Sequence, residues 1–329
     1  MTSPYDADMP STTHGDLSPI RALGRTDLVV SPLCLGGNVF GWTADTEQSF
    51  AVMDAYAEAG GNFIDTADAY SAWVPGNTGG DSERVIGEWL SARGNRSDVI
   101  IATKVAKWPV HPGLSPDNIR AAVEDSLRNL QTDYIDVYYA HEDDPSVPMA
   151  ETLAAFDELV RSGKVRCIAA SNFTADRLLE ALAVSADNGF TSYVAIQNEY
   201  NLMERAGYED GFAAIVLEHG LASLPYYSLA RGFLTGKYRP GITIDSPRAK
   251  GAEPYIGERG DRVLGALQDA AEAHDASIAA VALAWLLTRP GITAPLASAR
   301  NTDQFADLVA MGSLQLTDEQ RAALDAASA

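Results

Sequence analysis

The sequence predicts a single (β/α)8 barrel, the TIM-barrel class of α/β fold, with eight parallel strands and one extra helix at the end of the chain. Two observations support this. The chain of 329 residues is 46% hydrophobic and 21% charged, which is enough to bury one large core. Short apolar runs also alternate eight times with amphipathic stretches, as they do in a closed parallel barrel.

The first four strand and helix units follow the same pattern, an apolar run and then apolar residues at helical spacing. They are expected at 29–35 and 52–59, 62–65 and 82–90, 99–103 and 115–130, and 135–140 and 153–160. Gly60-Gly61 ends the first helix, Ser115-Pro116 opens the third and Gly163 closes the fourth.

The second half of the chain repeats this order. Its units are expected at 165–170 and 177–184, 193–197 and 212–220, 221–227 and 281–288, and 292–297 and 303–310. Thr317 with Gln320 forms a capping box for the extra helix over 321–327.

Residues 1–19 are polar and acidic, without periodic apolar positions, so we expect a disordered tail followed by one domain over 20–329. The first residues do not read as a secretory signal, and no apolar run approaches membrane-spanning length. We therefore expect a cytoplasmic protein with no membrane partner.

Charge and cysteine content exclude other classes. The formal charge of −21 opposes binding to nucleic acid and to anionic membranes. The two cysteines, Cys34 and Cys167, lie far apart without a CxxC or Cys/His cluster, so neither a disulfide nor a metal site is expected.

Two nucleotide-binding alternatives fail on spacing. The run 36–41 (GGNVFG) lacks the second glycine of a dinucleotide-binding turn, which counts against a doubly wound sheet. The run 232–238 (GFLTGKY) lacks both the glycine spacing of a phosphate-binding loop and the Ser or Thr after its lysine.

Polar residues end three successive strands: Asp65, Lys104 and His141. A lysine that closes an apolar strand needs a carboxylate to neutralise it, and Asp65 on the adjacent strand can do so. Tyr70 lies five residues after Asp65, close enough for its phenol to reach the same rim. Any one of these residues alone would be explained by packing or by a structural ion pair, and only their coincidence indicates a catalytic site.

The runs DTADAY, ATKV, DVYYAH, SNF (171–173) and QNEYN (197–201) together resemble the aldo-keto reductase superfamily over nearly all the chain after Ile20. By this resemblance Asp65, Tyr70, Lys104 and His141 match the catalytic tetrad. Tyr70 would act as general acid toward a carbonyl that receives hydride from NADPH. An ammonium beside the phenol favours phenolate, so we expect Lys104 to ease proton release, with Asp65 holding the lysine and His141 donating to the carbonyl oxygen.

The resemblance also implies a cofactor site. Ser171, Asn172 and Gln197 match positions that hold the nicotinamide carboxamide, and Tyr226 matches the aromatic residue that stacks on its ring. The stacking residue is Tyr227 if the alignment slips by one. The remaining expected cofactor contacts are Gly37, Asp65, Ser228, Leu229, Gly232, Lys237, Ser298, Arg300 and Gln304.

Two features favour NADPH over NADH. Arg300 matches the position that grips the adenosine 2′-phosphate, and a guanidinium suits phosphate geometry. The loop from Lys237 to Lys250 also carries Arg239 and Arg248 against one acid. Leu308 departs from the family, which often has asparagine there.

The loops after the second and third strands carry Trp73 and Trp108, the expected walls of the substrate pocket. The substrate would be a small aldehyde, ketone or sugar. The sequence leaves its identity, the favoured direction and the oligomeric state open. Two alternatives are a regulatory subunit resembling the potassium-channel β-subunits and a barrel lyase or isomerase that binds sugar phosphates.

Overall fold

The computed structural model describes residues 16–18, 20–238 and 249–329. Most of the expected disordered tail lies outside the described residues, as do Arg239 and Arg248 of the expected basic loop. Leu17, within the range expected as a tail, is buried, and its backbone N–H donates to Ala59 O at 2.8 Å. The packed core therefore extends to at least this residue.

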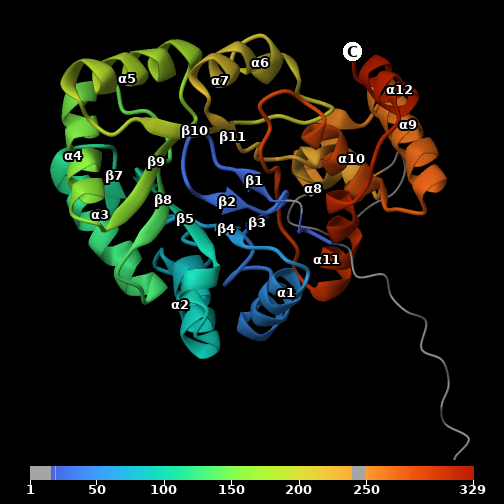
Figure 1. Ribbon diagram of the computed structural model, residues 1–329. Coiled ribbons are helices and arrows are strands. Elements are labelled where there is room, and N and C mark those ends of the chain that lie inside the picture. The colour runs from blue at the N-terminus through green and yellow to red at the C-terminus, as the bar shows by residue number, and fades with distance from the viewer. Residues whose placement is uncertain (1–15, 19, 239–248) are drawn as a thin grey trace, which may run out of the picture.

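Eight parallel strands form one curled sheet surrounded by helices, an arrangement consistent with a (β/α)8 fold (Figure 1). In spatial order the strands are β11 (Ala222–Ser223), β10 (Tyr193–Gln197), β9 (Val165–Ser171), β8 (Ile135–Ala140), β5 (Ile100–Val105), β4 (Phe63–Asp65), β3 (Cys34–Gly36) and β12 (Leu296–Ala297). Every neighbouring pair runs parallel.

The edge strand β11 also pairs with the segment that leads into the other edge strand, β12. Ser223 in β11 forms an isolated parallel bridge with Ile292. The Ser223 N–H donates to Gly291 O at 3.1 Å, and Ser223 O accepts from the Thr293 N–H at 2.9 Å. Both backbone groups of Ser223 are therefore paired with the segment that leads into β12.

The helices alternate with the strands as the sequence predicts. Their bounds are α1 Thr46–Glu58, α2 Asp81–Arg93, α3 Pro116–Leu130, α4 Met149–Arg161, α5 Ala175–Asn188, α6 Ala206–Glu209, α7 Ala213–His219, α8 Ala249–Ala252, α9 Glu258–His274, α10 Ile278–Leu287, α11 Thr302–Val309 and α12 Asp318–Ser328. The cap at Ser115 and the capping box of Thr317 with Gln320 are both confirmed. Among the described residues no single helix is long and apolar enough to cross a membrane; α9 and α10 pass that test only together, bent by 96°.

Two parts of the secondary-structure prediction are wrong. The expected strand 29–35 splits into β2 (Val29–Val30), which pairs antiparallel with β1 (Arg21–Ala22), and β3 of the main sheet. The break falls at Ser31-Pro32, where proline has no N–H for a ladder and the Ser31 N–H donates to Asn62 Oδ1 instead. Helices α8 and α9 were not predicted, because only one helix was expected between the last two strands, and the short helix α6 was not predicted either.

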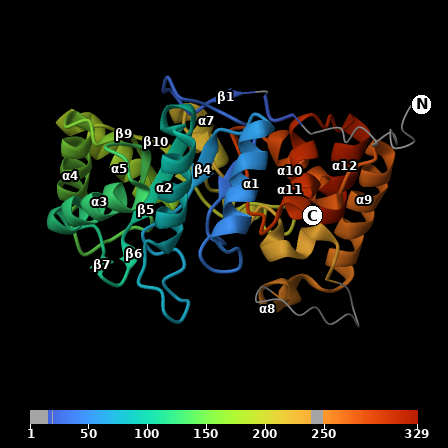
Figure 2. The ribbon, with the colours of Figure 1, turned by 90° about the horizontal axis from the view of Figure 1, so that it is seen from below.

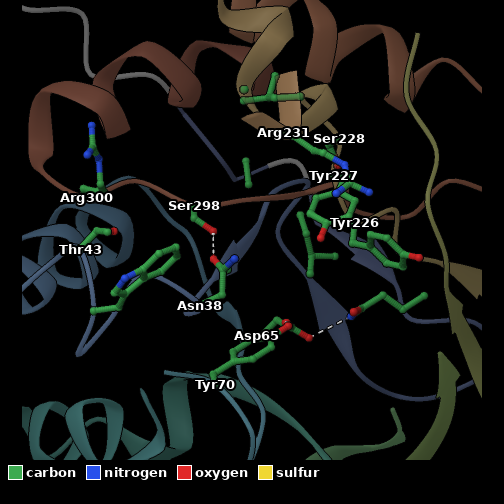
Figure 3. Close-up of a pocket in the computed structure, with 18 of the residues that line it drawn as sticks. Asn38, Thr43, Asp65, Tyr70, Tyr226, Tyr227, Ser228, Arg231, Ser298 and Arg300 are labelled. Carbon is green, nitrogen blue, oxygen red and sulfur yellow. Dashed lines mark hydrogen bonds between the residues drawn. The ribbon is translucent and has the colours of Figure 1, made fainter. Parts of the chain in front are cut away.

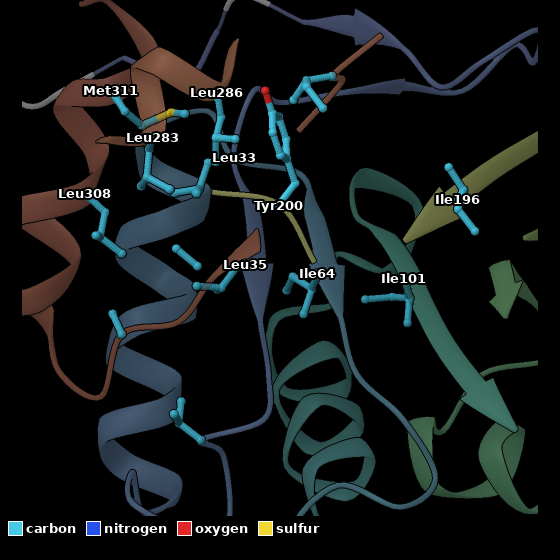
Figure 4. Close-up of a cluster of buried hydrophobic side chains, with 14 of the residues drawn as sticks. Leu33, Leu35, Ile64, Ile101, Ile196, Tyr200, Leu283, Leu286, Leu308 and Met311 are labelled. Atoms are coloured by element: carbon cyan, nitrogen blue, oxygen red, sulfur yellow. The ribbon is translucent and has the colours of Figure 1, made fainter. Parts of the chain in front are cut away.

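Alternation along the strands divides the core into two clusters. Cys34, Phe63, Ala102 and Val137 belong to an inner cluster enclosed by the curled sheet, which also contains Leu23, Leu28 and Val30 from the β1–β2 hairpin. Their neighbours in sequence pack outward against the helices, among them Leu35, Ile64 and Ile101 (Figure 4). Figure 2 shows β1 at one end of the sheet and α8, β6 (Lys107–Trp108) and β7 (His111–Pro112) toward the other.

Candidate active site

The side chains of the catalytic candidates point to the same side of the sheet as those of the inner cluster. Asp65 lies two residues after Phe63, Lys104 two after Ala102 and His141 four after Val137, so all three share the parity of the inner cluster. Because parallel strands end at the same rim, their side chains converge above the hydrocarbon interior.

The four candidates form one contact network at this rim. Lys104 Nζ donates to Asp65 Oδ2 at 2.6 Å and to Tyr70 Oη at 3.0 Å. Tyr70 Oη donates weakly to the same carboxylate oxygen at 3.4 Å. The Tyr70 and His141 rings meet edge to face, with centroids 5.9 Å apart. The structure therefore brings together the side chains that the sequence placed at separate strand ends.

The buried ion pair is fully hydrogen-bonded. The third acceptor of the Lys104 ammonium is Thr66 O at 2.7 Å, and the second oxygen of Asp65 accepts from Gln197 Nε2 at 2.9 Å. Lys104 is 0% exposed and Asp65 1%. A buried charge pair persists only when its remaining donors and acceptors are satisfied, and here they are.

The pKa of Tyr70 differs from the sequence-based expectation. Burial, and then the adjacent Asp65 carboxylate, raise the pKa of the Tyr70 phenol well above its usual range. This rise in pKa opposes the easing of proton release expected from Lys104, and a sequence does not show it because it does not show how fully the ring is enclosed. Tyr70 consequently keeps its proton at neutral pH.

His141 is neutral at neutral pH. Burial, followed by the nearby Lys104 and Lys107 ammonium groups, lowers the pKa of His141 well below its usual range. Its Nδ1 is buried with no hydrogen-bond partner among the described residues. A proton on Nε2 avoids an orphaned buried N–H at Nδ1, so His141 can donate a hydrogen bond without carrying a charge.

A cavity of about 1110 Å³ opens over this cluster. It exceeds the range of about 300–1,000 Å³ that holds a drug-sized ligand. Figure 3 shows Asp65 and Tyr70 at one side of it and Arg300 at another. Most predicted site residues line it: Asp65, Tyr70, Trp73, His141, Ser171, Asn172, Gln197, Tyr226, Ser228, Leu229, Gly232, Lys237, Ser298, Arg300 and Gln304.

Three predicted residues do not line the cavity. Lys104 lies beneath Tyr70, to which it donates its hydrogen bond. Gly37 faces α2: a side chain there would meet Ser82 Oγ at 3.0 Å. Trp108 covers Gly79 and packs edge to face on His111, with centroids 5.1 Å apart. It therefore braces the loops instead of walling the cavity.

The expected carboxamide residues are already connected to each other. Asn172 Nδ2 donates to His141 O at 2.8 Å and to Ser171 Oγ at 3.0 Å. Its Oδ1 accepts from Tyr226 Oη at 2.8 Å. Both Tyr226 and Tyr227 line the cavity. Tyr226 lies two residues after Leu224 of the inner cluster and so has the inward direction, whereas Tyr227 is 42% exposed.

The far end of the cavity contains a cation beside a helix start. Arg300 lies just before α11, whose cap is the Asn301 side chain. Its backbone N–H donates to Gln304 Oε1 at 3.1 Å, and no carboxylate of the described chain forms an ion pair with its guanidinium. Ser298 Oγ donates to Asn38 Oδ1 at 2.6 Å.

Sequence reasoning missed several cavity residues, among them Gly36, Asn38, Trp42, Thr43, Lys107 and Arg231. Strand parity could have found two of them, since Gly36 and Asn38 continue the inward row of Cys34 and Gly37 does not. Trp42 and Thr43 lie in a loop and Arg231 at a kink inside the 3-10 segment Ala230–Thr235, so no regular periodicity predicts where their side chains point.

Comparison with known proteins agrees with this site. The sequence model of the aldo/keto reductase family matches residues 32–329. The uncharacterized oxidoreductase YrpG of Bacillus subtilis (strain 168) is 36% identical over 306 residues, 90% of this chain and 92% of that protein. Norsolorinic acid reductase B of Aspergillus parasiticus is 31% identical over 335 residues, covering 96% and 85% of the two chains.

A third relative has a different described role. A protein described as a probable voltage-gated potassium channel subunit beta, from Oryza sativa subsp. japonica, is 31% identical over 298 residues, covering 87% and 89% of the two chains. Fold, site and relatives together define a nicotinamide-dependent carbonyl oxidoreductase. The chain belongs to the aldo/keto reductase family.

Proposed function

We propose that this protein is a cytoplasmic NADPH-dependent reductase of an aldehyde, ketone or sugar, with Tyr70 as the general acid. The observation that carries the proposal is the buried Asp65–Lys104–Tyr70 network, which faces a cavity together with His141. We also propose that the curled sheet is a closed barrel, since Ser223 pairs with the segment before β12.

The residues around the cavity fit a nicotinamide dinucleotide. Ser171, Asn172 and Gln197 offer hydroxyl and amide groups for a carboxamide, and Tyr226, hydrogen-bonded to Asn172, offers a ring face. Arg300, free of a carboxylate partner in the described chain, would hold the adenosine 2′-phosphate. Its position before α11 adds backbone N–H groups that favour an anion.

Bound in this cavity, the cofactor supplies the hydride. The chain's own residues do the rest: Tyr70 gives its proton to the carbonyl oxygen, and His141 donates a hydrogen bond to the same atom. Proton transfer leaves a phenolate whose oxygen is 3.0 Å from the Lys104 ammonium. Lys104 therefore eases proton release by stabilising the phenolate that forms, and so counters the effect of burial and of Asp65 on the Tyr70 pKa.

The direct test is Tyr70→Phe. The variant should fold and bind NADPH but lose at least about two orders of magnitude in single-turnover carbonyl reduction, the scale for removing a positioned acid. Tyr134→Phe, which removes a hydroxyl at the other end of the sheet near Arg96, is the matched control and should be unaffected. Near-normal turnover in Tyr70→Phe would overturn the assignment.

A second candidate is a cofactor-binding regulatory subunit, favoured by the similarity to the rice protein described above. The two functions differ in a measurable way. A regulatory subunit would bind NADPH and retain its function in Tyr70→Phe, whereas a reductase would lose turnover against every carbonyl compound tested.

A further inference from the structure

The cavity is more positive than the molecule around it. The whole chain has 24 basic and 45 acidic residues. The charged residues that line the cavity are Lys107, Arg231, Lys237, Arg300, Asp65 and Asp307. Asp65 is paired with Lys104, and Arg231 lies 3.9 Å from Glu199, which leaves three cations, Lys107, Lys237 and Arg300, against Asp307 within the described chain. A local positive cavity in an acidic protein favours an anionic ligand.

One of these cations lies at the catalytic end. Lys107 is in β6, three residues after Lys104, and lines the same cavity as Tyr70 and His141. Its charge is near enough to His141 to contribute to the lowered pKa of the imidazole, after burial and Lys104. Arg300 and Lys237 belong to the proposed cofactor contacts, and Arg231 lies over the Tyr227 ring and 3.9 Å from Glu199, so Lys107 is left for the substrate.

Lys107 is incompletely neutralised. Its Nζ is 3.6 Å from Glu142 Oε2, whereas a charge-assisted hydrogen bond is about 2.7–2.9 Å long. The Lys107 side chain is 34% exposed and that of Glu142 48%. The ammonium can therefore donate to a second carboxylate with little rearrangement of the side chain.

Beside the catalytic tyrosine the cavity has an aromatic wall. The Trp42 and Trp73 rings meet edge to face with centroids 5.5 Å apart, and Trp73 meets Tyr70 at 6.4 Å. Trp73 is 52% exposed, so part of its apolar surface has no partner in the described chain. Such a wall suits a flat apolar ring.

We propose that the substrate is an aromatic carbonyl compound that carries a carboxylate. Its ring lies against Trp42 and Trp73, its acid group pairs with Lys107, and its carbonyl oxygen meets Tyr70 and His141. This inference rests on the proposed reductase function and names the substrate class of the same site.

The test compares 3- and 4-formylbenzoate with their methyl esters, which keep the ring and the aldehyde but lose the charge. The wild type should favour an acid over its ester by about tenfold in kcat/KM. Lys107→Met should abolish that ratio, and Lys107→Arg should retain it. Lys164→Met, which removes a surface cation paired with Glu124, should also retain it. Glu142→Gln should raise the ratio by removing the competing carboxylate.

A binding measurement makes the test independent of turnover. Terephthalate carries a second carboxylate in place of the aldehyde of 4-formylbenzoate, so it cannot be reduced. It should quench the tryptophan fluorescence of the wild type with a Kd about tenfold lower than that for Lys107→Met. Equal acid and ester rates, or equal terephthalate binding in wild type and Lys107→Met, would overturn this inference alone. Failure to reduce any of the four aldehydes would instead overturn the proposed reductase function.

Discussion

Asp68→Asn is expected to stabilise the protein, and more strongly as the pH rises. Asp68 lies two residues before Tyr70 and is 2% exposed. Burial, and then the nearby Glu83 carboxylate, raise the pKa of Asp68 from 3.8 to about 8, while the Ala69 amide and Lys104 offset only part of this rise. The folded protein therefore holds a proton that the unfolded chain releases.

The sign and size follow from proton linkage. Between pH 3.8 and about 8 the unfolded state binds fewer protons, so the free energy of unfolding falls as pH rises. Each pH unit lowers the free energy of unfolding by about 1.4 kcal/mol, so the loss due to Asp68 reaches about 4 kcal/mol at pH 7. Asparagine has nearly the same shape and cannot ionise, so the variant escapes this loss.

Urea unfolding followed by tryptophan fluorescence at about pH 5.5, 6.5 and 7.5 measures the effect. The stability advantage of Asp68→Asn should grow by about 1.4 kcal/mol per unit. Asp54→Asn is the control: the hydrogen bond from Arg93 lowers the Asp54 pKa below 3.8, so this change should destabilise the protein by the same amount at all three pH values. An advantage for Asp68→Asn that does not vary with pH would refute the reasoning.

Three further predictions concern the cofactor contacts and His141. Arg300→Ala should raise the KM for NADPH by about tenfold and leave that for NADH nearly unchanged, because only NADPH carries the 2′-phosphate. Tyr226→Ala should weaken NADPH binding, measured by fluorescence quenching, more than Tyr227→Ala does, since Tyr226 has the inward parity and bonds Asn172. The rate of carbonyl reduction in single turnovers should stay flat as pH falls through the usual range of histidine, because the pKa of His141 lies well below it.

Each of these has a contradicting result. Equal losses with both cofactors would show that Arg300 does not read the 2′-phosphate. A larger effect of Tyr227→Ala would mean that the alignment slips by one residue. A rate change with an apparent pKa near 6.5 that disappears in His141→Asn would show that the imidazole titrates normally.

Strand ends and alternation made much of the site predictable. A polar residue that closes an apolar strand has a fixed inward or outward direction, so the sequence alone suffices to place Asp65, Lys104 and His141 together. The same rule separates Gly36 from Gly37 and favours Tyr226 over Tyr227. The fold class was predictable from a second pattern, the eightfold alternation of strand and helix segments along the chain.

Loop side chains were not predictable in this way. Trp73 and Trp108 both follow strand ends, yet one lines the cavity and the other covers Gly79. The direction of each ring depends on contacts between loops distant in sequence. The raised pKa of Tyr70 escaped prediction for a related reason, because burial depends on everything that surrounds a group and not on its nearest charge.

The filled interior below Lys104 limits how a proton can reach Tyr70. Apolar side chains occupy the space enclosed by the sheet, and Leu23, Leu28 and Val30 of the β1–β2 hairpin are packed among them. Water consequently has no route to Tyr70 from that end within the described chain. Under the proposed mechanism the Tyr70 phenolate would therefore recover its proton through the mouth of the cavity, the opening that substrate and product would also use. Reprotonation of Tyr70 and release of product would then share one passage.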